Sequence, residues 1–482
     1  MDHNTSGGSP EILPFYPDLS MLKRNLFSEP GSENGNRAAC SWTESVLTVI
    51  SSIIFVGLFP VALAAQIMSA GSPAVYGSGN QTPLQFAGES GPVNQVSFGV
   101  GTSVLYDNNA FAIGSHGVGD EAFSFNSHLG IARQTEHLTA SLDYMPFFLF
   151  YRTLDQFDRL NHSGGLTLAY KLTPRVVLGL SDRISYEDGS YGSLTGLQIL
   201  SGPSLPTAVN QTIIPYTTRT LMNMAGLNLT FVKSSRASVT FAASEDQIKY
   251  GHQAGQALIN GSGMSGGLTY QYRVTEHTSF GITFLHHDFK YQGGEVYGTG
   301  LRAQVESTIF SYTSRLSPTV NVTVFGGPQY VHTLGQVSPG ASRTGDLAGS
   351  AGGSITKQVQ KTALDLSIQR SVVEAAGLYT TTVNTLATLG VRRRLIGRWE
   401  ADWSLNATRF ENPLYKRANG KTDALTGGVG INRPLLHGSV FHISYSTWHQ
   451  LSTGNLPISY NLDRNQIAMG VDYQFKARPL GR

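Results

Sequence analysis

The sequence predicts an all-β fold: a transmembrane, antiparallel, up-and-down β-barrel of about 18 strands, with 16 as the alternative, after a signal peptide. Three observations predict this fold. Apolar and polar residues alternate through about 18 segments, short and long connections alternate between these segments, and the chain contains one long apolar run. Charged residues make up only 14% of the chain and Gly occurs 54 times, a composition that is unusual for a cytosolic enzyme.

The long apolar run, Val46–Gln66, follows three basic residues and ends in Ala62-Leu63-Ala64, a pattern of the kind that signal peptidase cuts. The run is too short and too poorly flanked to favour a permanent span. We therefore expect residues 1–64 to be an extended N-terminus with a signal peptide, cleaved near Ala64. A single membrane anchor is the alternative.

Removal of residues 1–64 leaves 31 basic and 26 acidic residues, a net charge of about +5. No basic run remains, so no nucleic-acid partner is expected. Cys40, the only cysteine, lies ahead of the apolar run. An exported chain without cysteine has no disulfides, so its stability must come from hydrogen-bonded sheet and from burial.

Residues 65–93 are rich in Gly, Ser and Pro and are expected to form a linker, after which the alternating pattern repeats through residues 94–475. Residues 348–359 are Gly-rich and form a weak segment. The pattern also changes phase at His286-His287 and at Ile309-Phe310, which indicates either bulges or misplaced boundaries. The clearest segments are 95–104, 166–172, 237–244, 268–274, 398–407 and 467–475.

The connections between the segments are of two kinds, which alternate along the chain. Such an alternation is typical of an up-and-down sheet inserted asymmetrically in a membrane, with short turns on one side and long loops on the other. The short connections are 134–136, 173–175, 234–236, 275–277, 317–319, 360–361, 396–398 and 434–438, and the longer ones are 187–216, 247–260, 333–345, 373–380, 411–422 and 450–462.

The polar faces of the predicted strands carry charges that a dry core would not tolerate unpaired, so we expect these faces to line a wet lumen. The pore-lining candidates are Asp143, Lys171, Arg183, Arg273, Arg302, Glu306, Asp365, Arg392, Arg394, Glu400, Asp402 and Asp472.

Aromatic residues gather on the apolar faces near the short connections, where a membrane-interface girdle would lie. Ordinary strand propensity is the alternative explanation, because aromatic residues favour strands in any sheet. These residues are Tyr170, Phe231, Tyr272, Trp399, Tyr473 and Phe475.

The last alternating segment ends in Gly470-Val471-Asp472-Tyr473-Gln474-Phe475. This stretch resembles the C-terminal signal of bacterial outer-membrane β-barrels, Gly-x-x-Φ-x-Φ. The resemblance implies an outer-membrane location and recognition by the barrel-assembly machinery, with Gly470, Tyr473 and Phe475 as the assembly signal. The short basic tail 476–482 departs from the pattern, because most members of this group end at the final Phe.

Residues 161–186 and the ending "RNQIAMGVDYQF" also resemble porin-like barrels associated with exopolysaccharide gene clusters. Together the resemblances cover residues 94–475 as a porin-like barrel, with 65–93 as a periplasmic linker.

The sequence contains no phosphate-binding Gly-Lys loop, no H-E-x-x-H motif and no paired cysteines. Adjacent histidines on a strand point to opposite faces, so His286 and His287 cannot easily share a metal ion. His442 and Ser444 lie on one inward face, but a hydrolase would need an orienting partner for them. We therefore expect no catalytic residues, no metal, no cofactor and no enzymatic activity.

A barrel this wide leaves an aqueous lumen, which predicts a channel that passes small polar solutes or saccharides by diffusion, surrounded by outer-membrane lipid. Polysaccharide export, or another role of a barrel associated with surface polysaccharide, is one alternative. A surface adhesin or structural outer-membrane protein is another. The longest connection, Glu187–Thr217, is expected to form either a neutral constriction of the lumen or an outward cap.

Overall fold

The structure, a computed structural model, describes residues 94–110, 117–188, 219–251, 260–292, 301–334, 344–375, 379–411, 421–435, 438–453 and 461–480. The chain divides into two units after Ala64, and all described residues belong to the second unit, Ala65–Arg482. The predicted signal peptide, the linker 65–93 and the connection 189–215 lie outside the described residues, so the expectations for them remain predictions.

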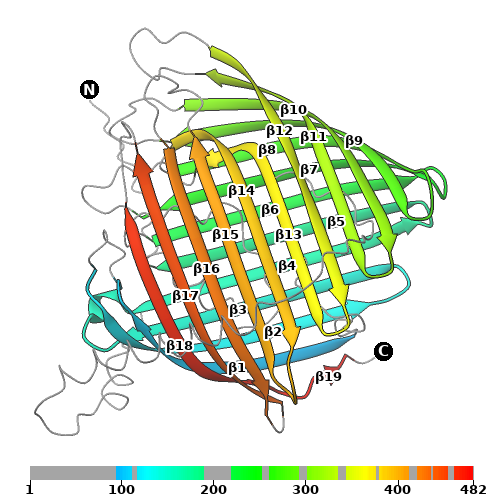
Figure 1. The fold of residues 1–482 in the computed structure, drawn as a ribbon. Helices are drawn as coiled ribbons and strands as arrows, with labels where there is room; N and C mark the ends of the chain where they lie inside the picture. The colour runs from blue at the N-terminus through cyan, green and yellow to red at the C-terminus, as the bar shows by residue number, and fades with distance from the viewer. Residues whose placement is uncertain are drawn as a thin grey trace, which may run out of the picture. The chain divides into compact units, whose positions relative to one another are not determined.

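Eighteen long strands form the wall (Figure 1), and one short strand and one 3-10 turn accompany them. The elements are β1 (Gln95–Asp107), β2 (Asp120–Gln134), β3 (Leu138–Tyr151), η1 (Asp155–Phe157), β4 (Arg159–Thr173), β5 (Val176–Asp188), β6 (Arg219–Val232), β7 (Ala237–Tyr250), β8 (Asn260–Arg273), β9 (Thr278–Gln292), β10 (Leu301–Ser317), β11 (Val320–Leu334), β12 (Thr344–Val359), β13 (Thr362–Ala375), β14 (Tyr379–Arg394), β15 (Glu400–Glu411), β16 (Lys421–Pro434), β17 (Ser439–Thr453), β18 (Leu462–Gln474) and β19 (Arg478–Pro479).

Each strand from β1 to β17 pairs antiparallel with the next strand along the chain, and β1 also pairs with β18. The sheet is therefore closed, which confirms the predicted fold class of an up-and-down barrel with 18 strands. The architectural resemblance to outer-membrane barrels is confirmed at the level of this fold. Among the described residues, no helix is long and apolar enough to cross a membrane.

One face of the wall carries the large exposed apolar side chains. In β1, Phe98 and Val104 are exposed, whereas Ser103 and Leu105 are buried. Register partners on neighbouring strands lie on the same face of the sheet, so this face can be followed from strand to strand. Because side chains alternate along a strand, this face is the outside of the barrel and the other lines the lumen. Exposed members of this face near the short turns include Tyr170, Phe231, Tyr272 and Phe475, where the sequence predicts a girdle.

Eight connections of two to five residues lie at one end of the barrel, here called the short-turn end, and the connections that alternate with them lie at the opposite end, here called the long-connection end. Ser and Thr side chains stabilise the short turns by accepting bonds from nearby backbone N–H groups, a known preference of these residues. Ser234 Oγ accepts from the N–H of Ala237 at 3.1 Å, and Thr135 Oγ1 accepts from that of Leu138 at 3.0 Å. The predicted alternation of short and long connections is present except between β13 and β14, where β13 ends at Ala375 and β14 begins at Tyr379.

The two phase changes in the sequence pattern have different origins. The register of β9 with β8 and β10 runs without interruption through His286 and His287. Here the outer face becomes polar and the inner face becomes apolar, so the change lies in the chemistry and not in the backbone. At Ile309, the ladder between β10 and β9 is continuous. The ladder between β10 and β11 is interrupted there: it omits residues 308–309 of β10 and residues 327–328 of β11. Pro328 lies in this gap and has no N–H to donate.

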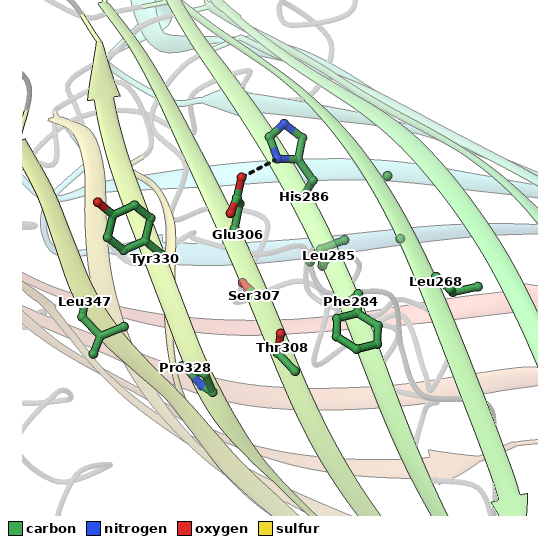
Figure 2. Close-up of a pocket in the computed structure, with 12 residues that line it drawn as sticks. Leu268, Phe284, Leu285, His286, Glu306, Ser307, Thr308, Pro328, Tyr330 and Leu347 are labelled. Atoms are coloured by element: carbon green, nitrogen blue, oxygen red, sulfur yellow. Dashed lines mark ion pairs between the residues drawn. The ribbon is translucent and has the colours of Figure 1, made fainter.

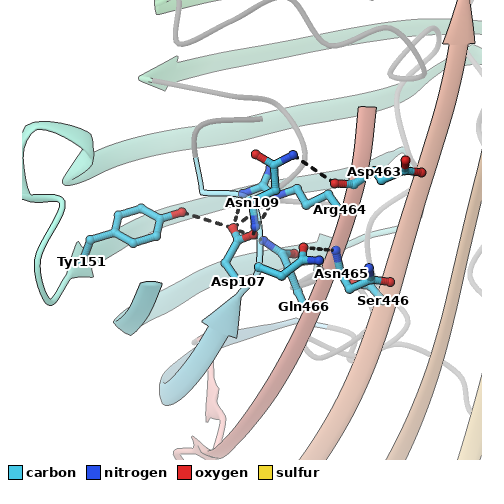
Figure 3. A network of polar contacts seen from close by, with 9 residues as sticks. Asp107, Asn109, Tyr151, Ser446, Asp463, Arg464, Asn465 and Gln466 are labelled. Carbon is cyan, nitrogen blue, oxygen red and sulfur yellow. Dashed lines mark hydrogen bonds and ion pairs between the residues drawn. The ribbon is translucent and has the colours of Figure 1, made fainter. Parts of the chain in front are cut away.

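The seam between β1 and β18 is reinforced at the long-connection end by a fully buried ion pair. The Arg464 guanidinium contacts both carboxylate oxygens of Asp107, with Nε at 3.1 and 3.0 Å and Nη2 closer still (Figure 3). Gln466 Nε2 donates to the same carboxylate at 2.9 Å, and the Tyr151 hydroxyl donates at 3.4 Å. Strands β1, β3 and β18 thus share one polar network inside the barrel.

Arg464→Met and Asp107→Ala are each expected to lower the free energy of unfolding by about 3–5 kcal/mol, because either change leaves a buried charge without its partner. The double variant should lose clearly less than the sum of the two, which a double-mutant cycle by urea unfolding in vesicles would measure. As a control, Arg152→Met removes an exposed pair with Glu121 and should cost less than about 1 kcal/mol. Additive losses would contradict this role for the pair.

Candidate functional site: the barrel lumen

The inner wall is built mainly from small neutral polar side chains, and many of them hydrogen-bond across strands. Because each hydroxyl can both donate and accept, the two hydroxyls of a pair can hydrogen-bond to each other and still present acceptor lone pairs to the lumen. The pairs include Ser103–Ser124 at 2.5 Å, Thr230–Thr240 at 2.9 Å, Ser244–Ser265 at 2.5 Å, Thr269–Thr283 at 3.0 Å and Ser367–Thr388 at 2.6 Å.

Charged residues of β14 and β15 form a compact inner cluster near the short-turn end. Arg392 Nη2 lies 2.6 Å from Glu400 Oε2, and Arg394 Nε lies 3.2 Å from Glu400 Oε1. Asp402 accepts a bond from Asn432 Nδ2 at 2.7 Å. One glutamate therefore holds two arginines on the wall, and all four predicted lumen residues of these two strands are brought together.

A second inner pair joins β17 and β18. His442 Nδ1 lies 3.0 Å from Asp472 Oδ2, and the imidazole is almost fully buried. Gly470 lies beneath the ring: a Cβ at this position would collide with the carbonyl oxygen of Thr102 and with His442 Nε2. His442 thus lies close to a carboxylate, but within the described residues neither ring nitrogen makes a hydrogen bond.

The remaining predicted lumen residues are placed singly or in small groups on the inner face. Asp143 on β3 interacts electrostatically with Arg183 on β5 and with His128 on β2. Asp365 accepts a bond from Thr356 Oγ1 at 3.1 Å. Lys171 and Arg273 lie on the inner face at the short-turn end. That these residues line a conducting pore remains a prediction.

Two of the predicted residues, Arg302 and Glu306, do not face the lumen. The register pairs Glu306 with His286 and Tyr330, and it places both Arg302 and Glu306 on the same face as the exposed Phe310. Arg302 forms a bidentate pair with Asp288 at 2.6 and 2.5 Å on this outer face. The prediction failed because it equated polar with inner, whereas the outer face turns polar toward the long-connection end.

A shallow groove of about 590 Å³ lies on the outer face of β8–β12 at this change from apolar to polar (Figure 2). Leu268, Phe284 and Leu347 line it, and His286 and Glu306 face each other across 3.9 Å at its rim. The interrupted ladder at Pro328 and the small residues beside it explain why the wall is hollowed here.

The residues of the predicted assembly signal lie at the seam. Tyr473 and Phe475 point outward and their rings meet edge to face at 4.7 Å, while Phe475 also packs on Phe98 of β1 at 5.2 Å. The tail beyond Phe475 continues the seam, because Arg478 and Pro479 of β19 pair with the start of β1. Recognition of these residues by assembly machinery remains a prediction.

The two adjacent histidines of β9 lie on opposite faces of the wall. His286 lies on the outer face near Glu306, whereas His287 lies on the inner face, 3.4 Å from Asp246. Across the ranges that the structure describes, no group of three or more potential ligands is close enough to hold a metal ion.

Sequence reasoning missed two features of the lumen. Asp107 was not recognised because its strand was predicted to end sooner, although it shares the inward parity of Ser103 and Leu105. Two apolar clusters on the inner wall at the long-connection end were also not predicted, one containing Leu149 and the other Val331. The alternation rule in its simple form assumes that the inner face is polar along its whole length.

No known protein family and no curated protein matches this sequence. Among solved structures, the chain is similar to OpdQ of Pseudomonas aeruginosa, with 8% identity, a TM-score of 0.38 and coverage of 79% of this chain and 97% of that one. It is similar to OccAB3 of Acinetobacter baumannii, with 10% identity, a TM-score of 0.39 and coverage of 79% and 99%. It is also similar to the FrpB iron transporter of Neisseria meningitidis, with 9% identity, a TM-score of 0.37 and coverage of 79% and 82%. At TM-scores below 0.5, these similarities establish no function.

Gly470→Ala is expected to lower the free energy of unfolding by about 1–3 kcal/mol, because the added methyl group has no room between Thr102 and His442. Gly266→Ala is the matched control, since a Cβ at Gly266 would have no atom within 4 Å. Urea midpoints in detergent micelles would compare the two. Equal midpoints would show that Gly470 is not required by packing.

Proposed function

We propose that this protein is a bacterial outer-membrane channel that passes small polar solutes by diffusion through a water-filled barrel. The observation that carries the proposal is the closed 18-stranded wall with apolar side chains outside and hydroxyl, amide and paired charged groups inside. Barrels of 16–18 strands are wide enough to leave an aqueous passage. A closed antiparallel wall also satisfies its backbone internally, as a lipid environment demands.

The pairing of lumen charges favours uncharged polar solutes, including saccharides. Glu400 compensates Arg392 and Arg394 in part. The neutral hydroxyl pairs elsewhere on the inner face offer hydrogen bonds without adding charge. We therefore expect weak ion selectivity, since steering of ions needs a wall dominated by one sign of charge.

The proposed location follows from the same features. The outer apolar face would contact membrane lipid, and the last strand would be read by the barrel-assembly machinery. A cleaved signal near Ala64 would deliver the chain to the periplasm, with the short-turn end and both barrel termini on the periplasmic side. The long connections would then face outward.

In proteoliposomes we expect swelling rates that fall with sugar size through arabinose, glucose, sucrose and raffinose. Planar bilayers should show similar permeability to K⁺ and Cl⁻. Glu400→Gln should shift the reversal potential toward anion preference, because it leaves Arg392 and Arg394 without their shared carboxylate.

Glu306→Gln is the matched control for this change. It removes the same charge from the outer face and should leave the reversal potential unchanged. Absence of both swelling and conductance from a folded barrel would overturn the channel proposal, and an equal shift in the two variants would contradict the assigned faces.

Single-cysteine labelling tests the topology. Asp155→Cys, in η1 at the long-connection end, should react with a membrane-impermeant maleimide on intact cells. Ile396→Cys, at a short-turn residue that is 92% exposed, should react only after the outer membrane is permeabilised. The opposite pattern would invert the proposed orientation, and no reaction at Asp155→Cys before lysis would contradict its exposure at the cell surface.

A further inference from the structure

The wall of the barrel divides between β12 and β13 toward the long-connection end (Figure 1). The two strands pair from Ala351–Val359 on β12 to Thr362–Arg370 on β13. Beyond Ala351, β12 remains paired with β11, whereas β13 beyond Arg370 remains paired with β14. The wall therefore ends in two flaps. We name the part of β13 and β14 beyond the division, residues 371–375 and 379–384, the inner flap.

The burial pattern places the inner flap on the lumen side of the wall. Ile368 is 56% exposed on the outer face of β13, but Val372, four residues further on the same face, is only 7% exposed. Val383, its partner on β14, is 8% exposed. Both valines belong to one apolar cluster with inner-face residues of β9, β10 and β11, namely Phe289, Tyr291, Ala303, Val305 and Val331.

A polar contact fixes the same arrangement. The N–H of Val372 donates to Oε1 of Gln329 at 3.0 Å, although β12 lies between their strands in the sheet. Gln329 Nε2 in turn donates to Ser307 Oγ on β10 at 3.0 Å. β10 and β14 also come into direct contact, although three strands separate them in the sheet order. The outer face of β13 and β14 thus packs on the inner face of β9–β11, so the wall overlaps itself here.

We propose that the inner flap is the element that narrows the lumen toward the long-connection end and sets the size limit for solutes. This inference rests on the proposed channel function. Ser371 and Asn384, which are register neighbours, lie on the flap face opposite the two valines. Both side chains are themselves buried. The sequence had suggested residues 189–215 for this role, a segment outside the described residues.

The flap is held mainly by apolar packing, so charge should release it. Val372→Asp with Val383→Asp places two carboxylates in an apolar cluster, where ionised groups are strongly disfavoured. We expect higher single-channel conductance and faster swelling with raffinose. Val359→Asp is the control, because Val359 is exposed at the short-turn end of β12 and lies outside the overlap.

Cross-linking makes the test reversible. In a Val383→Asp background, Gln329→Cys and Val372→Cys should give high conductance when reduced and low conductance after oxidation. A folded Asp variant, shown by its heat-modifiable migration, with wild-type conductance would overturn the inference. If the Asp variants do not fold, Gln329→Ala removes the amide contact without adding charge. It should produce transitions between two conductance levels, and a single wild-type level would also overturn the inference.

The cross-link separates this inference from the channel proposal. Gln329→Cys should cross-link with Val372→Cys but not with Ile368→Cys, which lies on the outer face. That result without any conductance in the wild-type protein would defeat the channel and leave the overlap intact. Equal cross-linking of the two pairs would defeat the overlap itself.

Discussion

The antiparallel ladder between β1 and β18 is the interaction on which the rest of the structure depends. It turns a sheet with two open edges into a closed wall, in which the first and last strands each gain a second neighbour. Closure also separates an inner face from an outer face, so that alternate side chains of each strand lie inside and outside the barrel. The seam is secured differently at its two ends, by the buried Asp107–Arg464 pair at one and by Phe98 against Phe475 at the other.

The two halves of the lumen differ in chemistry. Near the short turns the inner wall is polar, with arginines held by Glu400 and with rows of hydroxyls. Toward the long connections, apolar clusters lie on opposite sides of the ring, one on β1–β3 and β18 and the other on β9–β11 with β13 and β14. The outer wall changes in the opposite sense, from exposed aromatic residues to ion pairs such as Arg302–Asp288. The barrel therefore exchanges its inner and outer polarity along its axis.

This exchange explains what the sequence could and could not predict. Strict alternation, turn residues and connection lengths depend on local geometry, so they predicted the closed barrel with 18 strands. Whether a polar residue faces the lumen depends on its position along the barrel axis as well as on its odd or even position in the strand. Asp402 and Arg392 lie in the half where polar residues face inward, so the register places them on the inner face. Glu306 lies in the other half and was assigned to the wrong face. The overlap of β13 with β11 was not predictable, because it joins strands that the alternation pattern treats as separated by β12.

The pairing of β19 with the start of β1 brings Gln95 and Pro479 together as register partners. The beginning and the end of the wall are thus neighbours, and a short peptide could join them without moving a strand. Because the wall is closed, its strand pairing does not depend on which strand comes first along the chain. Circularly permuted versions of this chain, opened in any of its long connections, would preserve every one of the ladders that form the wall.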